Sequence, residues 1–426
     1  MKKRSAHKRE NRSGSAIWRF FKKIFSGIKT VLNKIFPGIN VVKAFFSGVH
    51  SIWLIGIALL WLGHVNFLDG FEFMNDYINM RSFVKEYILQ KPPETDFADK
   101  VLLLNTSRNN ALVPLDNDNT INTVITDRRV LAEKLKILDE NSDSIRFIIC
   151  DIYFEMASAD KEADSLLQAV ILSLSAKNKF AMPGFYNDQS KTFHKPVFEG
   201  TAGLSQYRSS FLNNQFLKYS FIQYNHQKQI PLIAFESITG TQISRKKLGF
   251  ITYYTNDNQW VLNTIIPEFR YAQSNLKEGE NYFQLGLFED YLIQDGQLVI
   301  IGDFEGTNDV HHSMAGLNSG PIVLLNVITS LLAGDNKISW SYRILLFIVF
   351  FYVSFHSFYF SYQIVSGKTL KSKIIYQLID KRIYLLLLML VYISMIFFHH
   401  YIHILILLTY FGLLYFVEHY IVSVRR

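Results

Sequence analysis

IRFIICDIYFE, residues 145–155, is the stretch that decides the fold. Its first six residues are apolar except for Arg146, a pattern typical of a β-strand that is buried on both faces. Similar apolar runs occupy residues 101–104, 179–182 and 297–301. Cys150, the only cysteine, ends the first run, and its apolar neighbours predict a buried core thiol rather than a reactive one.

Helical patterns separate these strands. Apolar residues recur at helical spacing in residues 126–138, 164–176, 232–238 and 321–332, and residues 250–255 predict one more strand. Strands that alternate with helices of about a dozen residues need crossover connections, which favour a parallel sheet covered on both faces. The sequence therefore predicts an α/β domain with a mainly parallel sheet. Residues 185–230 are polar, aromatic and irregular, and no element is assigned to them.

Outside this region, four stretches have almost no charge. They lie within residues 51–67, 341–365, 383–398 and 401–417. A helix needs roughly 17 to 25 apolar residues to cross a bilayer, so we interpret each stretch as a transmembrane helix. The fold class expected for the whole chain is an α/β extracytoplasmic domain with four transmembrane α-helices.

Charge sets the expected orientation. The chain has a formal net charge of +8, but residues 67–340 carry 24 Lys and Arg against 33 Asp and Glu, whereas the remainder carries 20 basic and 3 acidic residues. Basic residues next to membrane helices stay on the cytoplasmic side. The pattern predicts a multi-pass protein of the inner (cytoplasmic) membrane, with both termini in the cytoplasm, lipid as a partner and the acidic domain outside.

This interpretation divides the chain into eight parts. A basic amphipathic segment (1–50) precedes the first transmembrane helix (51–67) and the extracytoplasmic domain (68–340). The second transmembrane helix (341–365), a cytoplasmic loop (366–382), two further transmembrane helices (383–398 and 401–417) and a short tail (418–426) follow.

Residues 95–365 resemble the type 2 CHASE domain, an extracellular sensor module of bacterial signalling proteins. The resemblance rests on the order and spacing of the following pieces: the strand Val101–Asn105, Thr126-Asp127-Arg128 at a helix start, Phe147 to Asp151 with Ile152 to Glu155, Asp160 and Asp164, Leu298 to Asp303, Asp309 to His312, Gly316, Gly320-Pro321 and Leu331 to Gly334. Two features depart from the family. The Trp- and Pro-rich stretch that often precedes the first helix is absent, and no output domain follows the last predicted span.

Acidic residues and one histidine follow the predicted strands. Parallel strands place their carboxyl ends at one edge of a sheet, where ligands bind. We therefore expect a candidate ligand-binding cluster there, made of Asp151, Glu155, Asp303, Asp309 and His311. Such ligands suit a divalent cation or a cationic molecule. The alternative is that these acids, like Asp160, cap helices and fix loops by accepting backbone N–H bonds.

Three functions stay open from the sequence. The resemblance implies a membrane-anchored extracytoplasmic sensor that binds an unknown small ligand and acts through a separate protein partner carrying the output. A scaffold subunit of a membrane complex is the first alternative. A metal-dependent hydrolase using Asp151, Asp303, Asp309 and His311 is the second. The sequence contains no familiar catalytic or nucleotide-binding motif, so no enzymatic activity is expected. An acidic domain also makes a nucleic acid partner unexpected.

Overall fold

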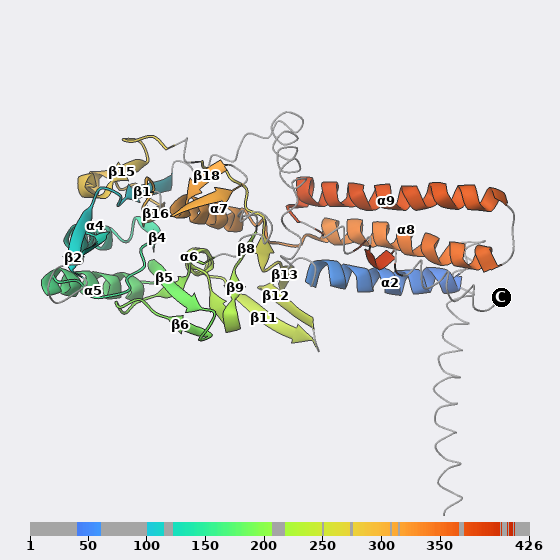
Figure 1. Cartoon of the computed structure of the whole chain (residues 1–426), viewed down its shortest axis with the longest axis horizontal. Coiled ribbons are helices and arrows are strands. Elements are labelled where there is room, and N and C mark those ends of the chain that lie inside the picture. The colour runs from blue at the N-terminus through green and yellow to red at the C-terminus, as the bar shows by residue number, and fades with distance from the viewer. Residues whose placement is uncertain are drawn as a thin grey trace, which may run out of the picture. The chain divides into compact units, whose positions relative to one another are not determined.

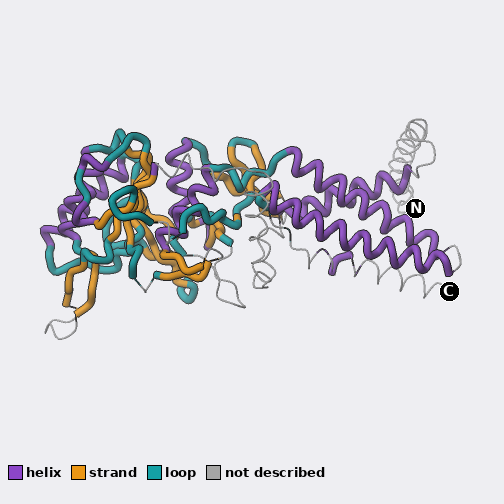
Figure 2. Tube along the Cα trace, turned by 90° about the horizontal axis from the view of Figure 1, so that it is seen from above, coloured by secondary structure: helices purple, strands orange, loops and turns teal. Residues whose placement is uncertain are grey.

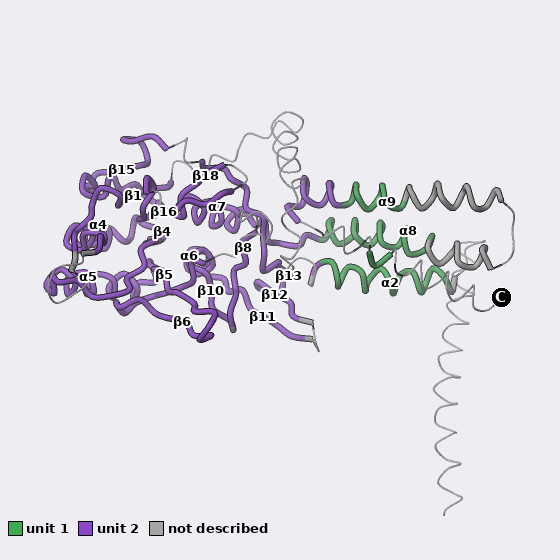
Figure 3. Tube along the Cα trace, in the orientation of Figure 1, with its two compact units in different colours: residues 1–58, 340–390, 404–426 green, residues 59–339, 391–403 purple. Residues whose placement is uncertain are grey.

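The computed structural model describes residues 41–60, 100–114, 122–206, 218–248, 251–272, 276–306, 309–313, 316–365, 370–400, 402, 407, 409–411 and 413. The chain divides into two compact units (Figure 3). Unit 1 comprises residues 1–58, 340–390 and 404–426, and unit 2 comprises residues 59–339 and 391–403.

A mostly parallel sheet forms the centre of unit 2. Its strands follow the order β15 (Tyr282–Gln284), β1 (Val101–Asn105), β16 (Gln297–Gly302), β4 (Ile145–Cys150), β5 (Phe180–Asn187) and β6 (Thr192–His194), and β7 (Ala202–Leu204) also pairs with β5. All of these pairs are parallel except β5 with β6. The predicted mainly parallel sheet is therefore present. The strand β16 lies between β1 and β4 although it is the last of this sheet's strands in the chain.

Helices cover both faces of this sheet (Figures 1 and 2). The helices α4 (Arg128–Glu140) and α5 (Lys161–Ala176) lie on one face, and α6 (Ile230–Thr239) and α7 (Gly320–Leu332) lie on the other. Successive residues of a strand point to opposite faces. Accordingly Phe147 and Ile149 belong to the core under α6 and α7, whereas Ile148 and Cys150 belong to the core under α4 and α5. Burial on both sides explains the unbroken apolar runs.

Helix starts follow the expected capping chemistry. The Asp127 carboxylate accepts the backbone N–H groups of Arg129 and Val130 at the start of α4, and the Asp160 carboxylate accepts that of Ala163 at the start of α5. The predicted boundaries of these helices differ from the observed ones by at most three residues, because apolar spacing marks the buried face rather than the cap.

Short antiparallel strands make up most of the rest of unit 2. They are β2 (Asn110–Pro114) with β3 (Asn122–Thr126), β8 (Tyr219–Ser220) with β14 (Thr264–Ile265), β9 (Ile222–Gln223) with β10 (Gln227–Lys228), the meander β11 (Ile243–Leu248), β12 (Ile251–Asn256) and β13 (Gln259–Val261), and β17 (Val310–Ser313) with β18 (Gly316–Ser319). Among the described residues, the 3₁₀ turn η4 (Tyr224–His226) joins β9 to β10, whereas η6 (Leu285–Leu287) and η7 (Asp290–Leu292) lie between β15 and β16 of the central sheet. Several of these elements lie in residues 185–230, where the sequence predicted none.

The helices described in unit 1 are α2 (Val41–Leu60), α8 (Trp340–Val365) and α9 (Leu370–Phe398). The last two residues of α2 and residues 391–398 of α9 belong to unit 2. None of the helices in the described residues is both long and apolar enough to cross a membrane. The transmembrane helices predicted at 51–67, 341–365 and 383–398 are therefore wrong where the structure describes them, and residues 61–67 and most of 401–417, the fourth predicted helix, lie outside the described residues. The multi-pass inner-membrane location and the extracytoplasmic placement derived from these helices are wrong with them.

The observed helix boundaries account for part of this difference. Residues 370–382, predicted as a loop, are helical and bring the charged residues Asp380, Lys381 and Arg382 into α9. In α2, the ring of His50 makes hydrogen bonds of 2.8 Å with Ser354 and 2.7 Å with Tyr410. Polar contacts thus occur within stretches that the apolar pattern alone assigned to lipid. The predicted basic segment 1–50 lies outside the described residues as far as residue 40.

Candidate functional site

A pocket of about 510 Å³ opens in unit 2 beyond the end of β4 and beside β5. This size is in the range of small-molecule sites. The sheet, the loop after β7, strand β17 and the start of α7 all contribute to its wall. The residues that matter most for its chemistry are Asp151, Tyr153, Tyr219, Asp309, His311 and Gly320.

Asp151 stands at the end of β4. Its backbone N–H donates to the carbonyl of Ile301 at 2.7 Å, which fixes the residue beside the end of β16. Asp151 lines the pocket, and none of the described residues donates a hydrogen bond to its carboxyl group. Burial, and then the negative charge of Asp309, raise the pKa of Asp151 to about 8. At neutral pH this side chain is therefore mostly a neutral acid in the wall of the pocket.

Asp309 and His311 form a pair in the lining of the pocket. The Nε2 atom of His311 lies 2.7 Å from Oδ1 of Asp309, and the backbone carbonyl of Asp309 accepts the N–H of Gly320 at 3.0 Å. A Cβ atom at Gly320 would collide with the Asp309 carboxylate. Glycine at the first residue of α7 thus leaves room for this carboxylate at the start of the helix.

Tyr219 and two glutamines hold the far wall. The Tyr219 hydroxyl donates to Oε1 of Gln229 at 3.1 Å, and Nε2 of Gln229 donates to the carbonyl of Gln206 at 2.7 Å. The Gln206 side chain in turn accepts the N–H of Tyr186 at 2.7 Å. Burial and the neighbouring Asp151 raise the pKa of the Tyr219 hydroxyl. This side of the pocket is fixed by its own hydrogen bonds.

Asp303 and Glu155 lie apart from this group. Oδ1 of Asp303 accepts the N–H groups of Glu305 at 3.1 Å and Gly306 at 2.6 Å, so this carboxylate closes its own turn after β16. Glu155 is exposed and does not line the pocket. Of the five candidates from the sequence, the structure therefore brings together Asp151, Asp309 and His311. For Asp303 the loop-fixing alternative describes the structure.

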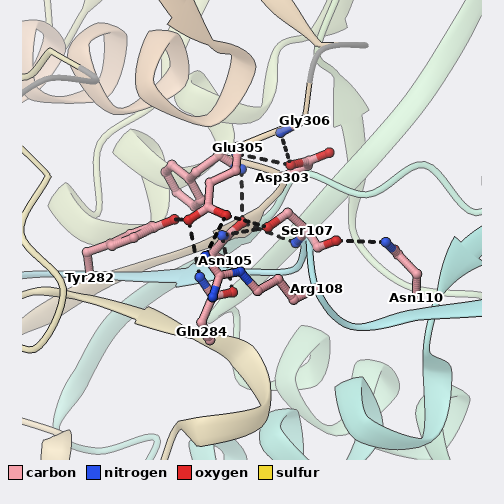
Figure 4. A network of polar contacts seen from close by, with 10 residues as sticks. Asn105, Ser107, Arg108, Asn110, Tyr282, Gln284, Asp303, Glu305 and Gly306 are labelled. Atoms are coloured by element: carbon pink, nitrogen blue, oxygen red, sulfur yellow. Dashed lines mark hydrogen bonds and ion pairs between the residues drawn. The ribbon is translucent and has the colours of Figure 1, made fainter.

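The turn of Asp303 belongs to a polar network that ties three strand ends together (Figure 4). Buried Asn105, at the end of β1, accepts the N–H of Phe304 at 3.1 Å and donates to Gln284 of β15 at 3.2 Å. Glu305 accepts the hydroxyl of Tyr282 at 2.8 Å, and this bond is the main reason that its pKa is lowered. These groups form hydrogen bonds with one another, so the network fixes the loops at the ends of β1, β15 and β16. None of its residues lines the pocket.

Gly302 connects the pocket to the packing of α7. A Cβ at this last residue of β16 would lie 2.6 Å from Cγ of Pro321 and 3.4 Å from Cβ of Asp151. We expect Gly302→Ala to lower the free energy of unfolding of unit 2 by roughly 1 to 3 kcal/mol, because the added methyl group pushes α7 off the strand end. Hydrogen exchange of the amides in β16 and α7 of the full chain would measure this. Unchanged protection would mean that Pro321 moves away at little cost.

No protein-family model, curated protein or solved structure matched this chain. The resemblance to type 2 CHASE domains therefore stays a prediction.

A second cluster of polar groups was not expected from the sequence. Glu268, Asp335 and His399 each offer one atom to a group in which all three atoms lie within 4.8 Å of one another, the one such set of three among the described residues. Nδ1 of His399 is 3.1 Å from Asp335, and Glu268 pairs with Arg270 at 3.2 Å. The guanidinium of Arg270 already supplies a positive charge there. Asp151, Asp309 and His311 do not form such a set, and a divalent cation in the pocket stays a prediction.

Sequence reasoning missed Tyr219, Gln206 and Ser205 in the pocket wall. All three lie in residues 185–230, where no periodic pattern was found. Tyr219 reaches the pocket because β8 pairs with β14, with Tyr219 opposite Ile265. Pairing between segments so far apart in the sequence leaves no local signal.

Proposed function

We propose that unit 2 is a small-molecule binding module, and that it works as a sensor whose bound state is read by a separate protein partner. The pocket beside Asp151 carries this proposal. It combines a concave wall, aromatic side chains and a few convergent polar groups, the combination that marks ligand sites in proteins. Its place beyond the ends of parallel strands is where open α/β sheets bind their ligands.

The acid at the end of β4 is the observation that favours ligand binding over a purely structural role. A carboxyl group that helps to hold the fold is normally paired or hydrogen-bonded, as Asp127, Asp160 and Asp303 are. Asp151 accepts no hydrogen bond from the described residues, and its ionised form is disfavoured by the protein around it. A group kept in this state is a functional-site candidate on physical grounds.

The hydrolase that the sequence left open has less support. That hypothesis placed Asp151, Asp303, Asp309 and His311 around catalytic ions, whereas the Asp303 carboxylate is bonded to its own turn. The scaffold alternative does not account for the pocket. Ligand binding accounts for the pocket and for Asp151 without requiring catalytic ions or a further protein surface.

A thermal-shift screen of the full chain would test the proposal. We expect at least one class of small molecule to raise the unfolding temperature, because a ligand that binds the folded state stabilises it by RT ln(1 + [L]/Kd), about 2.7 kcal/mol at 100 times Kd. The same compounds should fail to stabilise Ser205→Trp, in which an indole fills the pocket while its charged residues stay in place.

Asp143→Asn is the matched control, because Asp143 is exposed and lies in the turn before β4, away from the pocket. It should respond to ligands like the wild type. Hydrogen-exchange protection of β4 would establish that Ser205→Trp is folded. Equal stabilisation of the wild type and folded Ser205→Trp would place the ligand elsewhere and contradict the proposal.

A further inference from the structure

The charges in the wall of the pocket select the class of ligand. The described residues that line it include two carboxyl groups, on Asp151 and Asp309, one imidazole, on His311, and no lysine or arginine. Inside a partly enclosed pocket, charges act with less screening than in bulk water. Two acidic groups without a cationic side chain in the lining disfavour an anionic guest.

The two acids also have carboxyl oxygens that can accept hydrogen bonds from a ligand. Asp309 contacts His311 through Oδ1, and Gly320 lacks the Cβ that would press on its other oxygen, Oδ2. Asp151 has both carboxyl oxygens available to a guest, because the described residues donate nothing to them. An ammonium group has three donors and no acceptor, so it matches acceptor-only carboxylates better than a hydroxyl group does.

Aromatic rings in the pocket wall also favour a cationic ligand. Tyr153, which is 40 % exposed, and buried Tyr219 both line the pocket. An ammonium ion is attracted to the face of a tyrosine ring, and this attraction adds to that of the carboxylates. A cation with a short carbon chain would use the acids at one end and the apolar side chains of α7, Val323 and Leu324, along its length.

Resting on the proposed function, we propose that the ligand of this pocket is a small organic cation with a primary ammonium group, held between Asp151 and Asp309. An anion drawn to the neutral Asp151 acid and the start of α7 is the competing possibility, and the experiment below separates the two.

Binding of a cation should be coupled to the loss of a proton. The titratable groups near Asp151 are Asp309, Tyr219 and Cys150, and His311 is bonded to Asp309. Apart from burial, the negative charge of Asp309 is what raises the pKa of Asp151. A bound ammonium group stabilises the ionised form of Asp151, so the acid releases its proton. Below about pH 8, the affinity should rise close to tenfold per pH unit, because the proton and the cation compete for one carboxylate.

Titration calorimetry of the full chain would test this with matched probes. The amines are 1,4-diaminobutane and 2-phenylethylamine, their neutral counterparts are 1,4-butanediol and 2-phenylethanol, and succinate is the anion. We expect at least one amine to bind at least tenfold more tightly than its alcohol. At pH 7 the binding should release close to one proton, measured from the dependence of the heat on the ionisation enthalpy of the buffer. Asp151→Asn should weaken it at least tenfold and abolish the proton release.

Several results would contradict the proposal of a cationic ligand. Tighter binding of an alcohol or of succinate would do so, as would failure of both amines to bind, or amine binding that Ser205→Trp or Asp151→Asn leaves unchanged. The screen described under the proposed function distinguishes these failures. If compounds of another class stabilise the wild type but not Ser205→Trp, the proposal of a ligand-binding module stands and the proposal of an ammonium ligand fails. If no compound stabilises the wild type more than Ser205→Trp, both proposals fail.

Discussion

Asp151→Asn should make unit 2 more stable above pH 8 by roughly 2 to 4 kcal/mol, and by much less near pH 4. The reason is the pKa of Asp151, which folding raises from 3.8 to about 8. Between these two values the folded chain holds a proton that the unfolded chain has released, so stability falls as the pH rises and reaches its lower plateau above pH 8. Asparagine has no proton to lose. The expected gain is smaller than the full shift implies, because the pocket admits water.

Hydrogen exchange of the amides in β4 and β16, followed from pH 5 to pH 9 with correction for intrinsic rates, would measure this effect within the full chain. Asp309→Asn is an informative second variant. It removes the negative charge that raises the pKa of Asp151, and should therefore flatten part of the same pH dependence. Asp143→Asn, on the surface, should follow the wild type. Parallel stability profiles for the wild type and Asp151→Asn would contradict the prediction.

Arg128→Ala should destabilise unit 2 by roughly 3 to 5 kcal/mol, the usual cost of removing one partner of a buried ion pair. The Arg128 guanidinium lies 2.7 Å from Oδ1 of Asp164 and also donates to the carbonyl of Met156. It lies over the rings of Phe154 and Phe198, at 5.8 and 5.1 Å from their centres. Without it, the mostly buried Asp164 carboxylate would lose its counter-charge, and the carbonyl of Met156, in the segment after β4, would lose a donor.

The next residue offers the control. Arg129 pairs with Asp160 at 2.8 Å and Glu162 at 3.0 Å, but all three side chains are largely exposed. Arg129→Ala should therefore change the stability of unit 2 little, because exposed ion pairs contribute little to it. The exchange of amides in α4, α5 and β4 would report both variants. A similar loss of protection for the two would mean that burial of the Arg128 pair has no special effect.

The strands and helices of the sheet could be predicted because they obey local rules. Residues 145–150 and 297–301 are unbroken apolar runs since both faces of β4 and β16 are covered, and Asp127 and Asp160 lie where N-caps are expected. The rule that parallel strands share a carboxyl edge predicted one cluster of five residues, of which Asp151, Asp309 and His311 line one pocket and Glu155 and Asp303 do not. These features depend on short stretches of sequence and on one topological regularity.

What failed depends on context that a short stretch does not contain. An acid after a buried strand has the same sequence signature whether it faces a pocket, as Asp151 does, or closes a turn, as Asp303 does. Tyr219 reached the pocket through a distant strand pair. The transmembrane prediction treated apolar runs as isolated units, whereas the helices that contain them have other boundaries and include polar contacts such as that of His50 with Ser354.

The late position of β16 in the chain affects how this protein can fold during synthesis. Strands β1 and β4 do not pair with each other, and each pairs instead with β16, for example Leu103 with Ile300 about 200 residues later. Until the ribosome has released residue 302, the central ladders of the sheet cannot form, and the apolar strands β1 and β4 keep open edges. Long-range parallel pairing of this kind folds slowly and exposes strands that can aggregate. The nascent chain thus has a long interval in which chaperones would protect it.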